Sequence, residues 1–181
     1  MGAYLGAEGL EKGVRVRVSS WRRVSHESFV PNAKGAGQYL NSVLAKQEAL
    51  SAGYDEALML NHDGYVVEGT GANLFLVRDG VARTPPTWAG ALDGFTRASV
   101  MRLLADEGVT VVEDQLSRSD LYYADEAFFT GTAAEVTPIS EIDDRTVGLG
   151  APGPVTLRAQ SRYMAAVRGE VPAYRHWLEL A

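Results

Sequence analysis

Hydrophobic and polar positions alternate most regularly near the start of the chain. Over residues 14–18 valines alternate with arginines, which predicts a half-buried β-strand. Residues 19–37 are polar and contain proline and glycine, so we expect a surface loop or the lining of a cleft. Residues 38–52 have helical spacing, and Gly53 follows where it can end the helix. The apolar side chains on one side of that helix are Leu40, Val43, Leu44 and Leu50.

Two hairpins are predicted in the middle of the chain. Residues 57–67 place apolar segments on either side of an Asn-His-Asp-Gly turn, and residues 74–82 do the same around Asp-Gly. Residues 68–73, with the sequence Glu-Gly-Thr-Gly-Ala-Asn, separate the two hairpins and are rich in glycine where a strand could have continued.

The second half of the chain mixes helices and strands without a regular alternation. The predicted helices are residues 96–107, a short segment that Ser117 or Ser119 caps and that runs through Tyr123, and residues 154–167. The predicted strands are residues 109–112 and 126–130. Because there is no repeat and no long linker, we expect one α/β or α+β domain whose sheet is covered by about three helices.

Composition and charge exclude several classes of protein. Apolar residues make up 46% and charged residues 22%, which excludes a wholly disordered or collagen-like chain of 181 residues. The net charge of −6 disfavours nucleic acid as a partner, because phosphate backbones bind to basic surfaces. The absence of cysteine excludes disulfides, zinc ribbons, iron–sulfur clusters and thiol catalysis. Without a long apolar run or a secretory signal, we expect a cytoplasmic protein with no membrane partner.

One of the three lysines has a distinctive setting. Lys34 lies in Pro-Asn-Ala-Lys-Gly-Ala-Gly, directly before a helix, and its small neighbours leave room for a bulky group at the ammonium. A lysine nucleophile typically forms a Schiff base with a carbonyl compound. The alternative is a loop lysine in water, and we expect Lys12 and Lys46 to be solvated charges of that kind.

Glu68 and two glycine–threonine segments are further candidates. Glu68 is either a turn residue at an exposed strand end or a buried acid that faces a cationic partner, with glycines that admit a flat ligand. Residues 94–96 open a helix and residues 131–134 follow a strand, so both segments suit an anion. The histidines are isolated, and neither a metal-ligand spacing nor a Gly-x-Ser-x-Gly motif is present. An amine, an acid and a phosphate-binding turn are what pyridoxal phosphate requires.

Longer segments around these candidates resemble one family. The segments are residues 33–40 (AKGAGQYL), 68–75 (EGTGANLF), 92–97 (LDGFTR), 131–138 (GTAAEVTP) and 153–156 (GPVT). They resemble, in the same order, the motifs of class IV (fold type IV) pyridoxal-phosphate-dependent aminotransferases. The similarity covers nearly the whole chain, and the pattern is more similar to branched-chain amino acid aminotransferases than to D-amino acid aminotransferases or aminodeoxychorismate lyases.

The resemblance implies a role for each matching residue. Lys34 would be catalytic: it would hold pyridoxal 5′-phosphate as a Schiff base and move a proton between the substrate and the cofactor. Glu68 would bind the ring nitrogen and Tyr39 the phenolic oxygen. The residues implied to hold the phosphate are Gly94, Phe95, Thr96 and Thr132. The residues implied to face the substrate are Thr132, Ala133 and Ala134.

The chain departs from the family pattern in three residues and in length. Asp93 and Phe95 stand where the family usually has proline and isoleucine, and Ala72 replaces a frequent glutamate. Asp93 places a negative charge near the phosphate, which would weaken binding. The resemblance implies that residues 1–181 are the C-terminal pseudo-barrel domain, with the N-terminal domain missing and residues 1–20 as the interdomain connector and first strand. The uncovered surface would favour a homo-oligomer.

The function that the resemblance implies is transamination of branched-chain L-amino acids with 2-oxoglutarate. One alternative keeps the cofactor but changes the reaction to that of a D-amino acid aminotransferase or an aminodeoxychorismate lyase. Another alternative is a truncated domain that folds but is catalytically weak or inactive.

Overall fold

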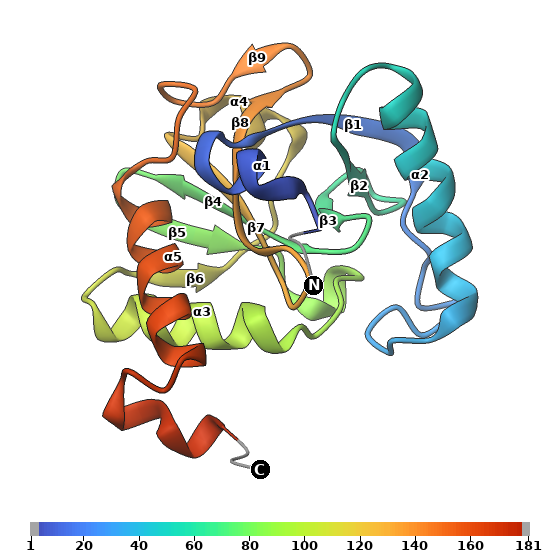
Figure 1. Ribbon diagram of the computed structural model, residues 1–181. Coiled ribbons are helices and arrows are strands. Elements are labelled where there is room, and N and C mark those ends of the chain that lie inside the picture. The colour runs from blue at the N-terminus through green and yellow to red at the C-terminus, as the bar shows by residue number, and fades with distance from the viewer. Residues whose placement is uncertain (1–3, 179–181) are drawn as a thin grey trace.

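The computed structural model describes residues 4–178 and consists of a twisted sheet with helices on its outside (Figure 1). The strands are β1 (Val14–Arg22), β2 (Glu56–Leu60), β3 (Val66–Gly69), β4 (Asn73–Arg78), β5 (Val81–Thr84), β6 (Val111–Glu113), β7 (Glu126–Gly131), β8 (Glu135–Ile142) and β9 (Arg145–Thr146). The helices are α1 (Gly6–Lys12), α2 (Tyr39–Ser51), α3 (Phe95–Asp106), α4 (Arg118–Tyr123) and α5 (Pro154–Val167), with 3₁₀ turns at Ala36–Gln38, Thr87–Ala89 and Pro172–Trp177. No helix within residues 4–178 has the length and apolar character needed to cross a membrane.

The sheet closes on itself. Its strands follow the order β3-β2-β1-β8-β7-β4, and β4 also pairs with β3 where Asn73 lies opposite Glu68. β5 and β6 continue the sheet beyond β4, and β9 pairs with β8. A closed ring of strands leaves few free edges, and it confirms the predicted α/β pseudo-barrel.

Several strands are buried on both faces. Successive side chains of a strand point to opposite faces of the sheet, so each such strand contributes to two cores. In β4, Leu74 and Leu76 belong to the core inside the ring, whereas Phe75 and Val77 belong to a second core under α3 and α5. Phe75 stacks on Phe128 of β7, with the ring centroids 5.0 Å apart. Two-sided burial therefore requires the nearly continuous apolar runs that these strands show.

Helix α2 covers the opposite side of the ring and packs against β1 and β2 (Figure 1). Its buried residues are small: Ser42, Ala45 and Ala49. The apolar stripe that the sequence pattern identified lies on the exposed side of the helix: Leu40, Val43, Leu44 and Leu50. Small residues let the helix approach the sheet closely, so the larger side chains remain available to another surface.

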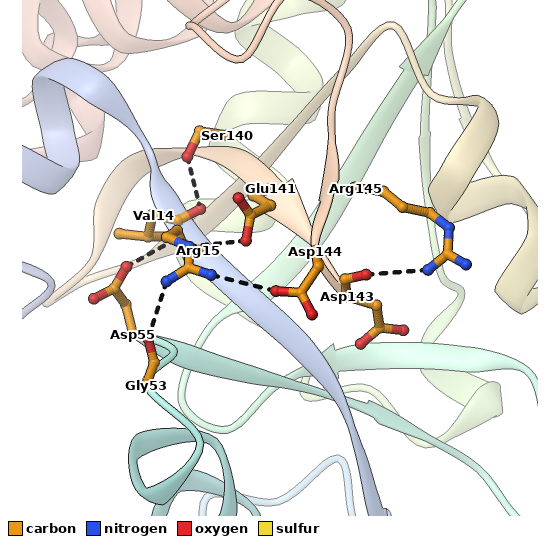
Figure 2. A network of polar contacts seen from close by, with 9 residues as sticks. All are labelled: Val14, Arg15, Gly53, Asp55, Ser140, Glu141, Asp143, Asp144 and Arg145. Atoms are coloured by element: carbon orange, nitrogen blue, oxygen red, sulfur yellow. Dashed lines mark hydrogen bonds and ion pairs between the residues drawn. The ribbon is translucent and has the colours of Figure 1, made fainter.

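A polar network joins the first residues of β1 to its neighbours (Figure 2). The guanidinium of Arg15 donates to Glu141 Oε1 at 2.8 Å and to the Gly53 carbonyl at 3.3 Å, and the Arg15 amide donates to Asp55 Oδ2 at 2.8 Å. Because Arg15 is exposed, water and salt screen its ion pairs, which contribute little to stability. The network therefore fixes the register of β1 between β2 and β8 more than it stabilises the fold.

Most predicted elements are present, and the differences have local causes. Both hairpins form, and Asp79 and Gly80 have the positive φ angles, 53° and 73°, that a tight type I′ turn requires. β1 continues to Arg22, so the first part of the predicted loop is strand. β6 begins later than predicted, because the Val109 amide donates to the Leu104 carbonyl and completes the end of α3.

Candidate active site

Five segments of the chain meet at a cavity of about 280 Å³, which we name the lysine cavity. The segments are the end of β1, the start of α2, the β3–β4 turn, the start of α3 and the β7–β8 turn. The predicted site residues that line this cavity are Lys34, Tyr39, Glu68, Gly94, Phe95, Thr96 and Thr132. Ala133 lines an adjacent cavity of about 320 Å³, and Ala134 lines neither of the two. The fold thus brings together side chains separated by about a hundred residues.

Glu68 is a buried acid and not an exposed turn residue. It lies at the end of β3 with 4% of its surface exposed. Its Oε1 is 2.8 Å from Nη2 of Arg23, and its Oε2 accepts from Asn73 Nδ2 and from the Leu92 amide, each at 3.0 Å. A carboxylate can accept about four hydrogen bonds, so the three donors leave room for one more from a ligand.

Burial changes the acidity of this carboxyl group. Loss of solvent raises the pKa of Glu68 from 4.5 to about 7, while the positive charge of Arg23 and the Leu92 amide act in the opposite direction. At neutral pH the group is therefore close to its own pKa. A cationic ligand placed next to it would favour the ionised form and bind more tightly in consequence.

Asn73 connects this acid to the start of α3. Its side-chain amide donates to Glu68 Oε2 and, at 2.8 Å, to the Leu92 carbonyl. Gly94 passes directly beside it, since a Cβ on Gly94 would lie 2.2 Å from Asn73 Oδ1. Only glycine fits at this position, and the first turn of the helix is held at a fixed place relative to Glu68.

The first turn of α3 faces the lysine cavity with free amides. Gly94 caps the helix without a side-chain hydrogen bond, and the first turn contains no acidic residue. Thr96, which is buried, and Thr132 of the β7–β8 turn add hydroxyl groups to the same cavity. Free amides and the helix dipole favour an anion such as a phosphate group.

The side of the lysine cavity that carries Lys34 is more exposed to solvent than the side that carries Glu68. Lys34 itself is exposed to solvent and lies in a segment without helix or strand. Gln38 is buried and donates to the Ala33 carbonyl, which folds the segment back toward α2. Lys46 differs from the prediction: its ammonium pairs with the buried Glu56, 2.9 Å from Oε2, and its side chain is only 19% exposed.

Three residues of the same cavity hold buried polar atoms that have no hydrogen-bond partner among residues 4–178. The atoms are Oδ1 of Asn32, Oε1 of Gln38 and Oγ1 of Thr130, and Thr130 is fully buried. Buried polar groups are normally hydrogen-bonded, so these atoms indicate a polar ligand. An amine, a buried acid, an anion-binding helix end and unpaired polar atoms together fit pyridoxal phosphate.

The adjacent cavity, which we name the tyrosine cavity, is lined by both aromatic or apolar and polar side chains. Tyr4, Tyr39, Val43 and Ala133 line it together with the polar residues of α2 that face it. Tyr39 and Gly71 line both cavities, so a molecule bound in the lysine cavity could extend an apolar group into the tyrosine cavity.

Sequence reasoning missed two residues of the site. Arg23, only 6% exposed, is the charge partner of Glu68, and Asn73 joins Glu68 to α3. Arg23 directly follows β1, where a charged residue after an alternating strand was a usable signal. Asn73 lies within one of the family-like segments, but its role depends on the pairing of β3 with β4, which the sequence does not show.

Comparison with known proteins identifies the family. The family described as Amino-transferase class IV matches residues 3–142. The chain is 49% identical over 179 residues to a branched-chain-amino-acid aminotransferase of Pseudomonas aeruginosa, and 46% identical over 178 residues to that of Escherichia coli K12. These matches cover 99% and 98% of this chain but 58% of each relative, so the chain spans little more than half of their length.

Solved structures give the same result. A branched-chain amino acid aminotransferase from Thermoproteus uzoniensis, solved with norvaline, matches with a TM-score of 0.90 and 48% identity, over 94% of this chain and 56% of that chain. The Escherichia coli branched-chain amino acid aminotransferase matches with a TM-score of 0.87 and 47% identity, over 93% and 54%. With the fold, the cavity and these matches in agreement, the chain belongs to the class IV amino-transferase family.

Proposed function

We propose that this chain binds pyridoxal 5′-phosphate in the lysine cavity and carries out transamination of branched-chain L-amino acids with 2-oxoglutarate. The observation that carries the proposal is the placement of the Lys34 amine, the buried acid Glu68 and the free amides of α3 around one cavity. The names of the relatives support the substrate class, and two solved relatives are complexes with pyridoxamine 5′-phosphate and with N-(5′-phosphopyridoxyl)-L-glutamate.

Each residue is proposed to have the task that the family resemblance implies for it. Bound pyridoxal phosphate supplies an electron-withdrawing ring that stabilises negative charge at the substrate Cα. Lys34 carries the cofactor between turnovers, and its free amine removes and returns the Cα proton. Glu68 accepts a hydrogen bond from the protonated ring nitrogen and keeps it protonated. Tyr39 hydrogen-bonds the phenolic oxygen of the cofactor.

The anionic groups bind at the ends of secondary structure. The phosphate binds to the amides of Phe95 and Thr96 and to the hydroxyl groups of Thr96 and Thr132. The substrate carboxylate binds at the β7–β8 turn, to Thr132 and the amides of Ala133 and Ala134. The apolar side chain of the substrate then points toward the tyrosine cavity, which Tyr4 and Val43 help to line.

We also propose that the chain forms a homo-oligomer. The support is the stripe on α2, where Leu40 is 68% exposed and Val43 is 51% exposed. Exposed apolar surface of this kind is typical of protein–protein contacts. Light scattering behind a sizing column measures the mass directly, and a monomer at all concentrations contradicts this part of the proposal.

Half-reactions test the proposed function. The purified protein is loaded with cofactor, and the change in its visible absorbance is followed after addition of L-leucine, D-alanine or aminodeoxychorismate. We expect conversion of the cofactor with L-leucine and its recovery with 2-oxoglutarate. A preference for D-alanine supports a D-amino acid aminotransferase, and pyruvate release from aminodeoxychorismate supports a lyase. Binding of cofactor without conversion by any substrate indicates a domain that is inactive alone.

A further inference from the structure

A charge cluster of Glu56 and Lys46 adjoins the β3–β4 turn, and neither of the two residues lines the lysine cavity. Glu56, at the start of β2, is fully buried, and its Oε2 lies 2.9 Å from the ammonium of Lys46 on α2. Its Oε1 accepts from the Ala57 amide at 2.8 Å and from the hydroxyl of Thr70 at 2.6 Å. A buried carboxylate is strongly unfavourable without partners, and here each of its oxygens has at least one.

Thr70 joins this cluster to the site. It follows Glu68 by two residues and lines both the lysine cavity and the tyrosine cavity. The turn that contains it is closed by a hydrogen bond from the Gly69 amide to the Ala72 carbonyl at 2.8 Å. Gly69 is packed so tightly that a Cβ there would lie 2.9 Å from Phe129 Cε1. The hydrogen bond from the Thr70 hydroxyl to Glu56 is thus the side-chain contact that anchors the middle of this turn.

We propose that Glu56 is a positioning residue that acts through Thr70, with Lys46 as its counter-ion. The bond from a hydroxyl to a carboxylate is short and stronger than a neutral hydrogen bond, so it restricts the turn at the wall of the cavity. With the turn in this position, Glu68 and Gly71 lie where the proposed cofactor requires them. This inference rests on the proposed function, because it assigns the cluster to cofactor binding.

Two substitutions of Thr70 separate the hydroxyl from the volume of the side chain. Thr70→Val removes the hydroxyl and keeps the shape, whereas Thr70→Ser keeps the hydroxyl. We expect Thr70→Val to weaken cofactor binding about tenfold in an absorbance titration, since hydrogen bonds to charged groups are worth that much or more. We expect Thr70→Ser to bind within about twofold of the unmodified protein, because it keeps the hydroxyl that donates to Glu56.

Thr156 provides a matched control. It is fully buried, its hydroxyl donates to the buried Glu126 Oε2 at 2.7 Å, and it lines neither cavity. Thr156→Val therefore removes the same kind of bond at the start of α5. We expect it to lower the midpoint of thermal unfolding as Thr70→Val does, without changing the affinity for the cofactor. A fall in affinity with both variants indicates a general loss of stability and overturns the inference.

A double-mutant cycle shows whether Thr70 acts through Glu56. Glu56→Met removes both acceptor oxygens at similar length, and it is combined with Thr70→Val. We expect the double variant to lose no more affinity than the single variant with the larger loss. Losses that add, or unchanged binding by Thr70→Val, overturn the inference while the proposed function stands. If the unmodified protein takes up no cofactor, it is the proposed function that fails.

Discussion

The two walls of the lysine cavity are held in place to very different degrees. Glu68 lies at a strand end, is almost fully buried and accepts hydrogen bonds from three fixed donors. Lys34 is exposed, and the backbone hydrogen bonds of residues 25–35 join only neighbours a few positions apart, such as the Gly35 amide and the Ala33 carbonyl.

The difference follows from what each group must do. A buried charge needs its partners in place before the ligand arrives, because an isolated ion in the interior is strongly unfavourable. An amine that carries the cofactor and then moves a proton has to change position during the reaction. Under the proposed function, the rigid wall around Glu68 supplies electrostatics and the open wall around Lys34 supplies the reacting amine. Substitutions on the two walls are therefore expected to fail in different ways.

The largest effect is expected on the open wall. Lys34→Ala removes the amine that we propose to hold the cofactor and to move the proton, so turnover should fall by about 10³-fold or more. Stability should change little, because the side chain is exposed. Steady-state rates and urea unfolding measure both quantities, with Lys12→Ala as a control for the loss of a lysine. Normal rates in Lys34→Ala contradict the assignment.

On the rigid wall, Glu68→Gln should weaken cofactor binding by about 10- to 100-fold, the range for a lost hydrogen bond to a charged group. The effect depends on pH, because burial raises the pKa of Glu68 to about 7. In the unmodified protein, affinity should rise with pH and level off above about pH 7, where the acid is ionised before the ligand binds. The variant should lack this part of the profile, which titrations on either side of neutral pH would show.

The same raised pKa affects the stability of the cofactor-free protein. The folded state holds the Glu68 proton more tightly than the unfolded chain, so this stabilising contribution is fully present below about pH 4.5 and is lost as pH rises through about 7. The unmodified protein should therefore lose stability relative to Glu68→Gln between these two pH values. Urea unfolding at several pH values measures the difference, and a constant gap would contradict the raised pKa.

A smaller effect is expected at the link between the two parts of the rigid wall. Asn73→Ala removes donors to Glu68 and to the Leu92 carbonyl, so it should lower the free energy of unfolding by about 1–3 kcal/mol and weaken phosphate binding. Asn41→Ala is the control, because it loses a hydrogen bond to the Arg22 carbonyl at a more exposed position. Equal losses of stability in the two variants would show that Asn73 has no special place in the wall.

The smallest expected effect is an increase in the affinity for phosphate. Asp93 is exposed and lies beside the free amides of α3, where a negative charge opposes a bound phosphate. Asp93→Asn should raise the affinity for inorganic phosphate and for the cofactor by about two- to fivefold, the size of a screened charge effect. Salt should reduce the gain. An affinity that is unchanged at low salt would show that Asp93 points away from the bound anion.

Much of the fold follows from local pattern. The helix from Pro154 to Val167, the Asp79-Gly80 hairpin and the short helix capped by Ser117 all form where the sequence predicts them. In each case the signal is contained within a few residues: a proline in the first turn, a residue pair with positive φ, and a capping side chain.

Other features depend on contacts that no local pattern contains. β8 carries Pro138 and alternates poorly, yet it lies between β1 and β7 in the closed ring. Helix α1 has no buried residue and little amphipathic signal, so it was not predicted. The exposed stripe of α2 was visible as a helical pattern, but only the packed sheet shows that Ala45 and Ala49 form the buried side.

The site divides in the same way. Residues of short motifs, such as Lys34, Glu68 and Thr132, could be singled out from the sequence and do share one cavity. Arg23 and Glu56 were not singled out, because their roles depend on partners brought close by strand pairing. Lys46 was expected in solvent, and its ion pair depends on that same unseen partner, Glu56.

The most direct test of the account is to locate the cofactor on the chain. Purified protein is incubated with pyridoxal 5′-phosphate, reduced with borohydride and digested, and the modified peptide is identified by mass spectrometry. The account predicts a single stoichiometric label on Lys34, prevented by removal of that amine. A label spread over Lys12 and Lys46, or no label with saturating cofactor, would contradict it.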